Sequence, residues 1–202
     1  MIDPASELRA YLQATAPGRR PIAGKLRELD STLAAKRFPR ISPWWMSTLE
    51  RFYSARQRVL VLRVGRRGGK SSTLCRVAVC EALWGGHDVP AGDIGIVAII
   101  SVKREEAEKR LLTVKALLDA IGVSYEPFPS GIRLKGRDIA FQVFTASIAG
   151  VSGFTCICAI CDEVSKWRDT DTGANPATEV LRSLRPTLST MPHARDDARA
   201  RG

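Results

Sequence analysis

The sequence predicts an α/β domain of three layers, in which helices cover both faces of a mostly parallel sheet. Apolar runs of strand length alternate with longer segments that have helical periodicity. Two runs, residues 93–101 and 156–161, are almost continuously apolar, as expected of parallel strands buried on both faces. A third apolar run, residues 59–64, passes through a glycine-rich turn into a helical segment. These three observations together predict the fold class.

The other elements follow from periodicity, capping residues and turn residues. Near the N-terminus, helical patterns cover about residues 3–14 and 23–36. Ser42 and Pro43 mark the start of a third helix that ends near residue 55. Further along we expect helices over 70–84, 103–120 and 175–188, a hairpin over 132–135 and 137–144, and a flexible turn over 149–153. The polar tail, residues 191–202, is expected to be disordered.

Composition is that of a globular protein, with 45% hydrophobic and 26% charged residues. No apolar run approaches the roughly 20 residues that a membrane-spanning helix needs, and the N-terminus lacks a secretory pattern. We therefore expect a cytoplasmic protein without a membrane partner. Cys158 and Cys161 have the spacing of a redox or metal site, but a strand places them on opposite faces. We interpret the five cysteines as small buried hydrophobes.

The net charge of +10 is concentrated in the first part of the chain. Residues 1–70 contain fifteen of the 31 Lys and Arg but only five of the 21 Asp and Glu. We expect residues 1–56 to form a basic, helical N-terminal arm. Such a charge excess attracts a polyanion such as DNA. A solvated face, or arginines used at a subunit interface, is the alternative.

The turn after residues 59–64 has the composition of a phosphate-binding loop. Glycines let several backbone N–H groups point at one anion, Lys70 adds a positive charge, and the hydroxyl that follows ligates Mg²⁺ in such loops. The strict pattern requires glycine at position 64, where this chain has Val64, so a basic loop with solvated side chains is the alternative. We expect the loop to bind a nucleoside triphosphate through Gly65, Arg66, Arg67, Gly68, Gly69, Lys70, Ser71 and Ser72.

Asp162 and Glu163 directly follow the buried run of residues 156–161. Two adjacent carboxylates at the end of a buried strand are costly unless they face a cleft or a cation. In open α/β sheets, ligands bind at that end of the strands. By the chemistry of phosphoryl transfer, Asp162 would hold Mg²⁺ and Glu163 would orient and deprotonate the attacking water. For the acidic pair alone, an acidic helix N-terminus is the alternative. Together with the glycine-rich loop, the acidic pair predicts an ATPase.

The loop Gly65–Ser71 and the sequence Ile160-Cys161-Asp162-Glu163 resemble the ATPase domain of the large subunit of tailed-phage terminases, which package DNA into procapsids. The order of elements between them, and residues 179–186 after them, fit the same family. The resemblance covers about residues 40–190 and implies a P-loop NTPase domain of the additional-strand, RecA-like type in residues 57–190. It implies ATP and Mg²⁺ as ligands and the following roles: Lys70 and Glu163 in catalysis, Ser71 and Asp162 at the metal, and Arg66 or Arg67 at the γ-phosphate.

The resemblance also implies partners and a location. These are double-stranded DNA, a portal protein, a small terminase subunit and, in the full-length form, further copies in a ring, all in the cytoplasm of a bacterial host. Terminases carry a glutamine that reads adenine near the start of this domain, and residues 42–46 contain none. Trp44 or Trp45 stacking on a base is one interpretation of this region, and a buried aromatic pair is the other.

The end of the chain departs from the family as well. After the helix that corresponds to residues 175–188, terminases continue with a coupling strand and a nuclease domain. In this chain no apolar strand follows Pro186. We therefore expect an incomplete ATPase domain without nuclease activity. The sheet would have a gap between residues 59–64 and the strand before Asp162, with both strand edges unpaired.

Two other functions stay open at this point. One is another P-loop nucleic-acid translocase, such as a helicase-like ATPase, which would need further strands and a second similar domain. The other is a catalytically inactive terminase remnant that binds DNA or a packaging partner through the basic N-terminal segment.

Overall fold

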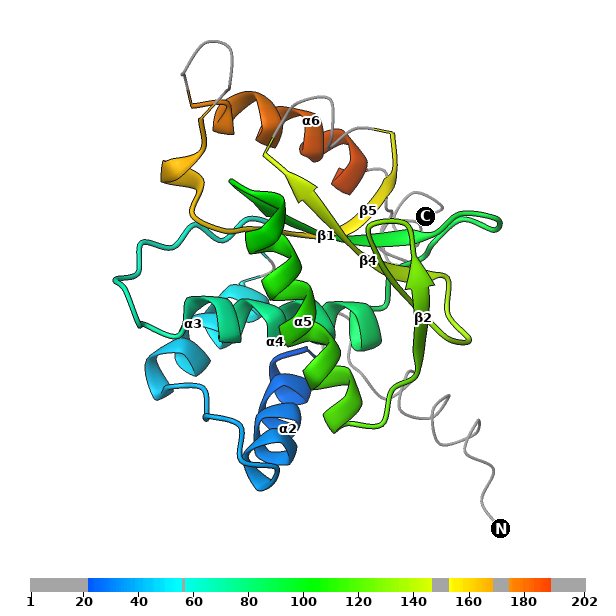
Figure 1. The fold of residues 1–202 in the computed structure, drawn as a ribbon. Coiled ribbons are helices and arrows are strands. Elements are labelled where there is room, and N and C mark those ends of the chain that lie inside the picture. The colour runs from blue at the N-terminus through cyan, green and yellow to red at the C-terminus, as the bar shows by residue number, and fades with distance from the viewer. Residues whose placement is uncertain (1–21, 56, 147–152, 169–174, 190–202) are drawn as a thin grey trace, which may run out of the picture.

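The computed structural model describes residues 22–55, 57–146, 153–168 and 175–189. The expected helix over residues 3–14, most of the turn at 149–153 and the tail from residue 191 lie outside this part of the chain. Within it, the prediction of an α/β fold is confirmed, with a five-stranded sheet and helices on both of its faces (Figure 1).

The sheet has the strand order β2-β3-β4-β1-β5. Its strands are β1 (Gly95–Ser101), β2 (Tyr125–Phe128), β3 (Gly131–Leu134), β4 (Ile139–Thr145) and β5 (Thr155–Cys161). The central strand β1 pairs in parallel with β4 and β5, whereas β3 pairs antiparallel with β2 and β4. The strands β4, β1 and β5 therefore form the parallel part of a mixed sheet, which β3 and β2 extend as antiparallel strands beyond β4.

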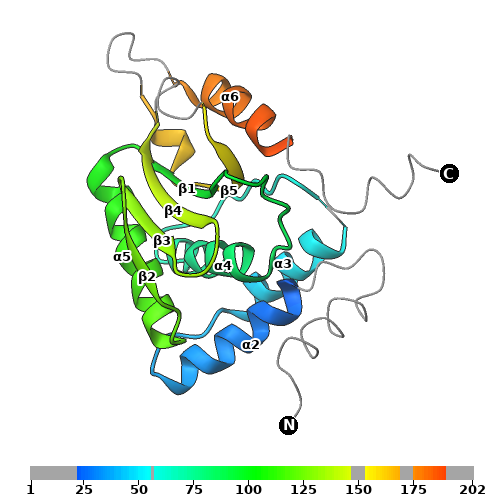
Figure 2. The same ribbon diagram turned by 90° about the vertical axis from the view of Figure 1, so that its right-hand side faces the viewer.

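Helices form the outer layers. They are α2 (Ile22–Ala35), α3 (Pro43–Ser54), α4 (Lys70–Trp84), α5 (Arg104–Ala120) and α6 (Ala177–Ser189), with a short 3₁₀ segment η2 (Val164–Lys166). Figure 2 shows α6 on one side of the sheet and α4 and α5 on the other, with α2 and α3 beyond α4. Each helix predicted in this part of the chain is confirmed, and the predicted ends differ by at most two residues.

A cluster of buried apolar side chains lies on each face of the sheet. Because side chains alternate along a strand, Val97 and Ile99 face the larger cluster under α4 and α5, and Ile96 and Ile100 face the smaller cluster under α6. The apolar face of α2 belongs to the larger cluster. The described part of the basic N-terminal segment therefore packs into the main core.

The strand predicted over residues 59–64 is wrong: this segment is not part of the sheet. Its side chains keep the alternation of a strand, since Leu60, Leu62 and Val64 pack against the larger cluster while Val59 and Val61 are 63% and 88% exposed. A strand needs a neighbour that completes its hydrogen-bond ladder. Among the residues that the structure describes, the edge strand β5 pairs only with β1.

The predicted hairpin is confirmed as β3 and β4, but β2 has no counterpart in the prediction. Pro127 lowers the strand propensity of β2, and it is tolerated because β2 is an edge strand. Gly131 allows the close approach of β3 to β4, since a Cβ at this position would overlap the carbonyl of Phe141.

Candidate functional site

The glycine-rich loop connects residues 59–64 to α4 through a tight turn. The N–H of Gly68 donates to the carbonyl of Gly65 at 3.3 Å, which leaves Arg66 and Arg67 at the tip of the turn. Arg67 has a φ of 60°, which lies in the left-handed region, where the backbone of a residue other than glycine is strained. Both arginine side chains are exposed.

Two glycines of the loop meet a steric or conformational requirement. A Cβ at Gly68 would lie 2.5 Å from Cγ1 of Val64 and 3.2 Å from the carbonyl oxygen of Gly65. Gly69 has a φ of 72°. By contrast, a Cβ at Gly65 would meet nothing within 4 Å. The order Gly-Gly before Lys70 is therefore required by the backbone, whereas glycine at position 65 is not.

Helix α4 begins at Lys70, directly after this loop. Its N-cap, Gly69, has no side chain that could accept hydrogen bonds from the first backbone N–H groups of the helix. These N–H groups and the positive end of the helix dipole therefore remain available at the loop. The Lys70 ammonium donates to the carbonyl of Val64 at 3.2 Å, across the base of the loop. Ser71 is the second residue of the helix and is half-buried. This arrangement has the donors that a bound phosphate needs.

Ser72 serves the packing of α4. The guanidinium of Arg76, 1% exposed, donates to the hydroxyl and the carbonyl of Ser72. It also donates to the carbonyl of Pro39 at 2.6 Å and lies 3.8 Å from Asp30 of α2. Burial lowers the pKa of Arg76, and the charge of Asp30 opposes that shift. The sequence-based prediction assigned Ser72 to the ligand and did not include Arg76.

Trp45 of α3 holds the loop from outside. Its indole Nε1 donates to the carbonyl of Gly68 at 2.7 Å, and its side chain is 3% exposed. Trp44 packs edge-to-face against Trp45, with ring centroids 5.1 Å apart, but it is 53% exposed. Of the two interpretations of this pair, burial therefore applies to Trp45 alone.

The acidic pair lies at the carboxyl end of β5, as predicted. The N–H of Asp162 donates to the carbonyl of Ile100 at 2.9 Å, which continues the ladder between β5 and β1. The side chain of Asp162 is buried, and Nε of Arg110 on α5 donates to its Oδ2 at 2.9 Å. The indole of the fully buried Trp167 donates to the carbonyl of Asp162 at 3.0 Å. These contacts fix Asp162 from two sides.

Glu163 has a strained backbone and a cationic partner. Its φ is 52°, and its carboxylate accepts from the Lys166 ammonium at 2.7 Å. This hydrogen bond lowers the pKa of Glu163, partial burial opposes the shift, and the charges of Lys166, Lys70 and Arg110 add to the lowering. Helix α4, which begins at Lys70, contacts β5, so the loop precedes and the acidic pair follows elements that pack together.

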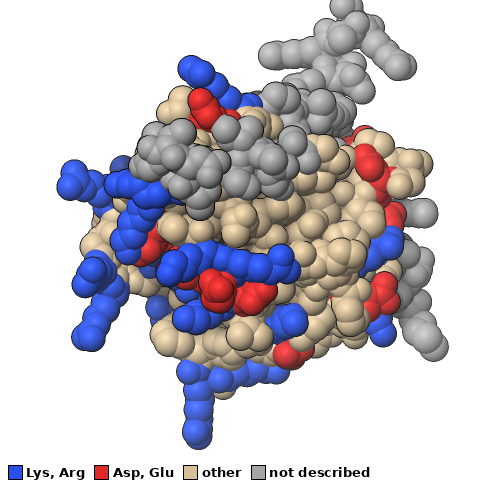
Figure 3. Space-filling view, turned by 45° about the horizontal axis from the view of Figure 1, so that its top comes forward, with Lys and Arg blue, Asp and Glu red and all other residues tan. Residues whose placement is uncertain are grey.

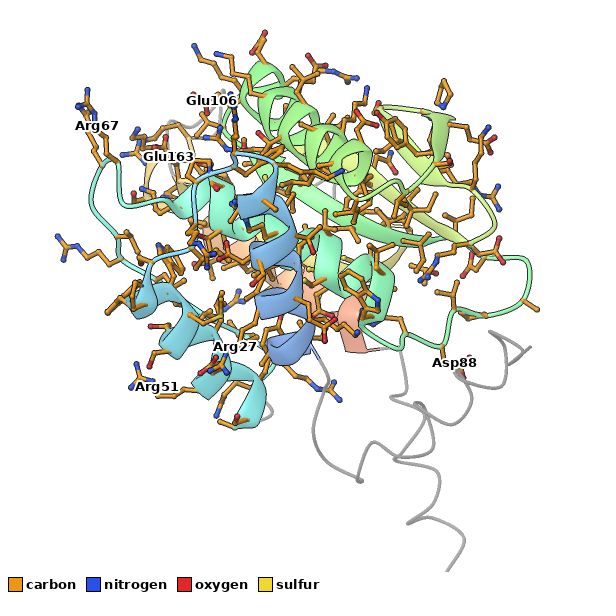
Figure 4. The ribbon with its side chains drawn as sticks, turned by 90° about the horizontal axis from the view of Figure 1, so that it is seen from below. Arg27, Arg51, Arg67, Asp88, Glu106 and Glu163 are labelled. Atoms are coloured by element: carbon orange, nitrogen blue, oxygen red, sulfur yellow. The ribbon has the colours of Figure 1, made fainter. Side chains whose placement is uncertain are left out.

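The two loop arginines are not bonded to the acidic pair in the part of the chain that the structure describes. Figure 4 shows Arg67 projecting from the tip of its loop, with Glu163 and Glu106 on the same side of the molecule. In the described part of the chain, Arg66 and Arg67 form no hydrogen bond or ion pair with Asp162 or Glu163. In Figure 3, which shows the molecule with the top of Figure 1 turned forward, Lys and Arg side chains project at the left edge, the side on which the loop lies in Figure 1.

The sequence contained a signal for Arg110 and none for Arg76. The apolar residues of α5 recur at helical spacing, and Arg110 falls within that stripe, three residues after Ala107 and four before Val114. A charged residue within an apolar stripe is expected to point inward and to need a partner. Arg76 lies in a helix that is buried on most sides, where periodicity gives no direction.

The donor set fits Mg²⁺ in part. Mg²⁺ prefers oxygen ligands and is commonly bound by one or two carboxylates together with phosphate oxygens. Asp162 and Ser71 supply such oxygens, although one carboxylate oxygen of Asp162 already accepts from Arg110. Among the residues described, no group of three or more His, Cys, Asp and Glu side chains is arranged to hold a metal. Cys158 packs toward the larger cluster and Cys161 toward the smaller one, so they lie on opposite faces.

No protein-family model, curated protein or solved structure matches this chain. None of the helices in the described ranges is both long enough and apolar enough to span a bilayer.

Proposed function

We propose that this chain is the ATP-binding and ATP-hydrolysing module of a viral DNA-packaging motor of the terminase large-subunit type. The observation that carries the proposal is the packing of α4, which begins at Lys70 directly after the glycine-rich loop, against β5, which ends just before Asp162 and Glu163. A helix that begins with a lysine, packed against a parallel strand that ends at a carboxylate pair, has the parts that phosphoryl transfer requires.

Each residue then has a defined task. The loop amides and Lys70 hold the β- and γ-phosphates, and Ser71 and Asp162 hold Mg²⁺, which neutralises charge on those phosphates. Glu163 orients the attacking water and accepts its proton. The lowered pKa keeps the Glu163 carboxylate ionised, so it can accept a hydrogen bond from a water, but it also makes the carboxylate a weaker base. Arg66 or Arg67 supplies charge to the γ-phosphate from the loop tip.

The partners belong to the same proposal. The excess of Lys and Arg in residues 1–70 favours a polyanion, and double-stranded DNA is the polyanion that a packaging motor moves. Exposed basic side chains of the described part of this segment include Arg27, Lys36, Arg37, Arg40, Arg51 and Arg58. A portal protein, a small terminase subunit and further copies in a ring complete the motor that the resemblance implies.

Phosphate release from ATP tests the enzymatic part. We expect the wild-type chain to release phosphate in the presence of Mg²⁺, and Lys70→Ala and Glu163→Ala to abolish this release. Arg104→Ala is the matched control, since it removes an exposed cation whose partner Glu108 is outside the site. Equal background rates in the wild type and in both site variants would reject the ATPase. Addition of duplex DNA tests whether the activity is coupled to that partner.

The second candidate is a protein that binds DNA or a packaging partner without turnover. It is favoured by two contacts: Arg110 already satisfies one oxygen of Asp162, and Lys70 already donates to Val64. This candidate predicts salt-dependent DNA binding that Lys70→Ala leaves unchanged, together with no phosphate release. DNA binding that survives replacement of the exposed Arg37, Arg40 and Arg51 by glutamine would contradict a role for the N-terminal segment in either function.

A further inference from the structure

We infer that Ser101 is an additional residue of the nucleotide site, where its hydroxyl binds a water of the divalent cation held at Asp162. The inference rests on the proposed function, because that cation arrives with a nucleoside triphosphate. It adds a binding residue from β1 to a site otherwise built from the loop and from the end of β5.

The hydroxyl of Ser101 is buried without a hydrogen-bond partner. The residue is 1% exposed, and its Oγ contacts no donor or acceptor among the described residues. Its backbone is satisfied, since its carbonyl accepts from the N–H of Ala146 at 3.1 Å. A buried hydroxyl without a partner destabilises the folded protein, so its presence at the end of the central strand calls for a ligand that completes it.

Strand register places this hydroxyl beside Asp162 on the same face. Ile99 pairs with Ile160, and both side chains lie in the larger cluster under α4 and α5. Two residues further along each strand, Ser101 and Asp162 face the same way, because side chains alternate. The contact of Asp162 with Arg110 of α5 agrees with this direction.

The neighbouring strand continues the row. Thr145 of β4 pairs with Ser101, and Val143, two residues before Thr145, faces the larger cluster. Oxygen-bearing side chains therefore end three adjacent parallel strands on the face that carries α4. That edge is where ligands bind in sheets of this kind, and α4 starts with Lys70 and Ser71.

A neutral hydroxyl suits a cation-bound water better than the cation itself. Mg²⁺ dehydrates reluctantly and usually keeps several waters when it binds with a phosphate substrate. A hydroxyl both donates and accepts, so Ser101 matches such a water. Loss of one such hydrogen bond weakens binding by up to about tenfold.

The test compares Ser101→Ala with Thr48→Val, which removes another buried hydroxyl without a partner, on α3. Two quantities are measured for each variant and the wild type: the melting temperature without ligand, and the Mg²⁺ concentration that half-saturates ATP binding. Removal of an unpartnered hydroxyl leaves the ligand-free melting temperature unchanged or higher in both variants. We expect Ser101→Ala alone to raise the half-saturating Mg²⁺ concentration about tenfold, with ATP binding in EDTA unchanged.

Three results would overturn the inference. A clear fall in the ligand-free melting temperature of Ser101→Ala would mean that the hydroxyl has a partner within the protein. An unchanged Mg²⁺ requirement, or an equal rise in Thr48→Val, would remove the link to the cation while the wild type still binds ATP. No ATP binding by the wild type would overturn the proposed function along with the inference.

Discussion

The guanidinium of Arg110 donates to the carboxylate of Asp162 over 2.9 Å and so joins α5 to the end of β5. Asp162 is buried, whereas the side chain of Arg110 is 27% exposed. The ion pair compensates a buried charge at the candidate cation site. A cation at Asp162 would therefore either share this carboxylate with Arg110 or displace the guanidinium of Arg110 from it.

Removal of this arginine should destabilise the ligand-free protein. Arg110→Ala leaves Asp162 buried without its cation, and we expect the free energy of unfolding in urea to fall by about 2 kcal/mol. Arg104→Ala breaks an exposed pair on the same helix and should cost less than about 0.5 kcal/mol. Millimolar Mg²⁺ should restore part of the loss in Arg110→Ala only. Equal losses in the two variants would contradict a compensating role for Arg110.

The glycines of the loop give a matched pair of substitutions. In Gly68→Ala the new methyl meets Val64, and the loop must shift, so we expect a loss of about 1 kcal/mol and weaker ATP binding. In Gly65→Ala the methyl enters open space, and the change should stay within about 0.5 kcal/mol. Urea denaturation and ATP titration measure both effects. A Gly65→Ala variant as damaged as Gly68→Ala would contradict the observed loop conformation.

The strained arginine allows stability to be separated from function. Arg67→Gly removes a left-handed non-glycine residue and should raise the free energy of unfolding by up to about 1 kcal/mol. Arg66→Gly, at a neighbouring position without positive φ, should lower it slightly, because glycine increases the entropy of the unfolded chain. If Arg67 acts at the γ-phosphate, its variant is more stable and yet slower in turnover. Full turnover by Arg67→Gly would assign that task elsewhere.

The fold was predictable where the pattern depends on local residues. Three elements could be predicted from their own residues, without knowledge of their neighbours. They are β1, from its continuous apolar run, the start of α3, from the capping pair Ser42 and Pro43, and α5, from the spacing of its apolar residues. Residues 59–64 show the opposite case, because their alternation is real but the ladder needs a partner strand. β2 was missed for a related reason: its existence depends on pairing with β3.

The site was predictable in its chemistry but less so in its contacts. Asp162 and Glu163 lie at the end of β5 because a buried strand must end before charged residues. Their partners come from elsewhere: Arg110 is 52 positions from Asp162 in sequence, and Trp45 is 23 positions from Gly68. Such contacts depend on how helices pack over the sheet, which periodicity alone does not determine.

The pH dependence of the site should follow Glu163 and Lys166. The lowered pKa of Glu163 stabilises the folded protein above the unfolded-state pKa of this carboxyl, and the contribution is lost as the pH falls through the folded pKa. Lys166→Ala removes the main cause, so the pKa of Glu163 rises and the acid limb of turnover moves to higher pH. Carboxyl titration by NMR measures the shift. An unchanged pKa in Lys166→Ala would contradict the observed pair.

The buried thiols predict behaviour at alkaline pH. Burial raises the pKa of Cys75, Cys156 and Cys161 to about 12. The folded state then retains protons that the unfolded chain loses near pH 9, so stability should decline as the pH rises from about 9 toward 12. At pH 8, thiol reagents should label the native protein far more slowly than the protein in urea. Rapid labelling of all five cysteines in the native protein would contradict this burial.

A single-turnover experiment tests the central claim most directly. Protein in excess over labelled ATP, with Mg²⁺ present, separates binding of the nucleotide from its cleavage. If the loop and the acidic pair form one site, the wild type converts bound ATP to ADP. Glu163→Gln then binds ATP without cleaving it, and Lys70→Ala binds ATP weakly. Cleavage by Glu163→Gln at the wild-type rate, or no binding by the wild type, would contradict the claim.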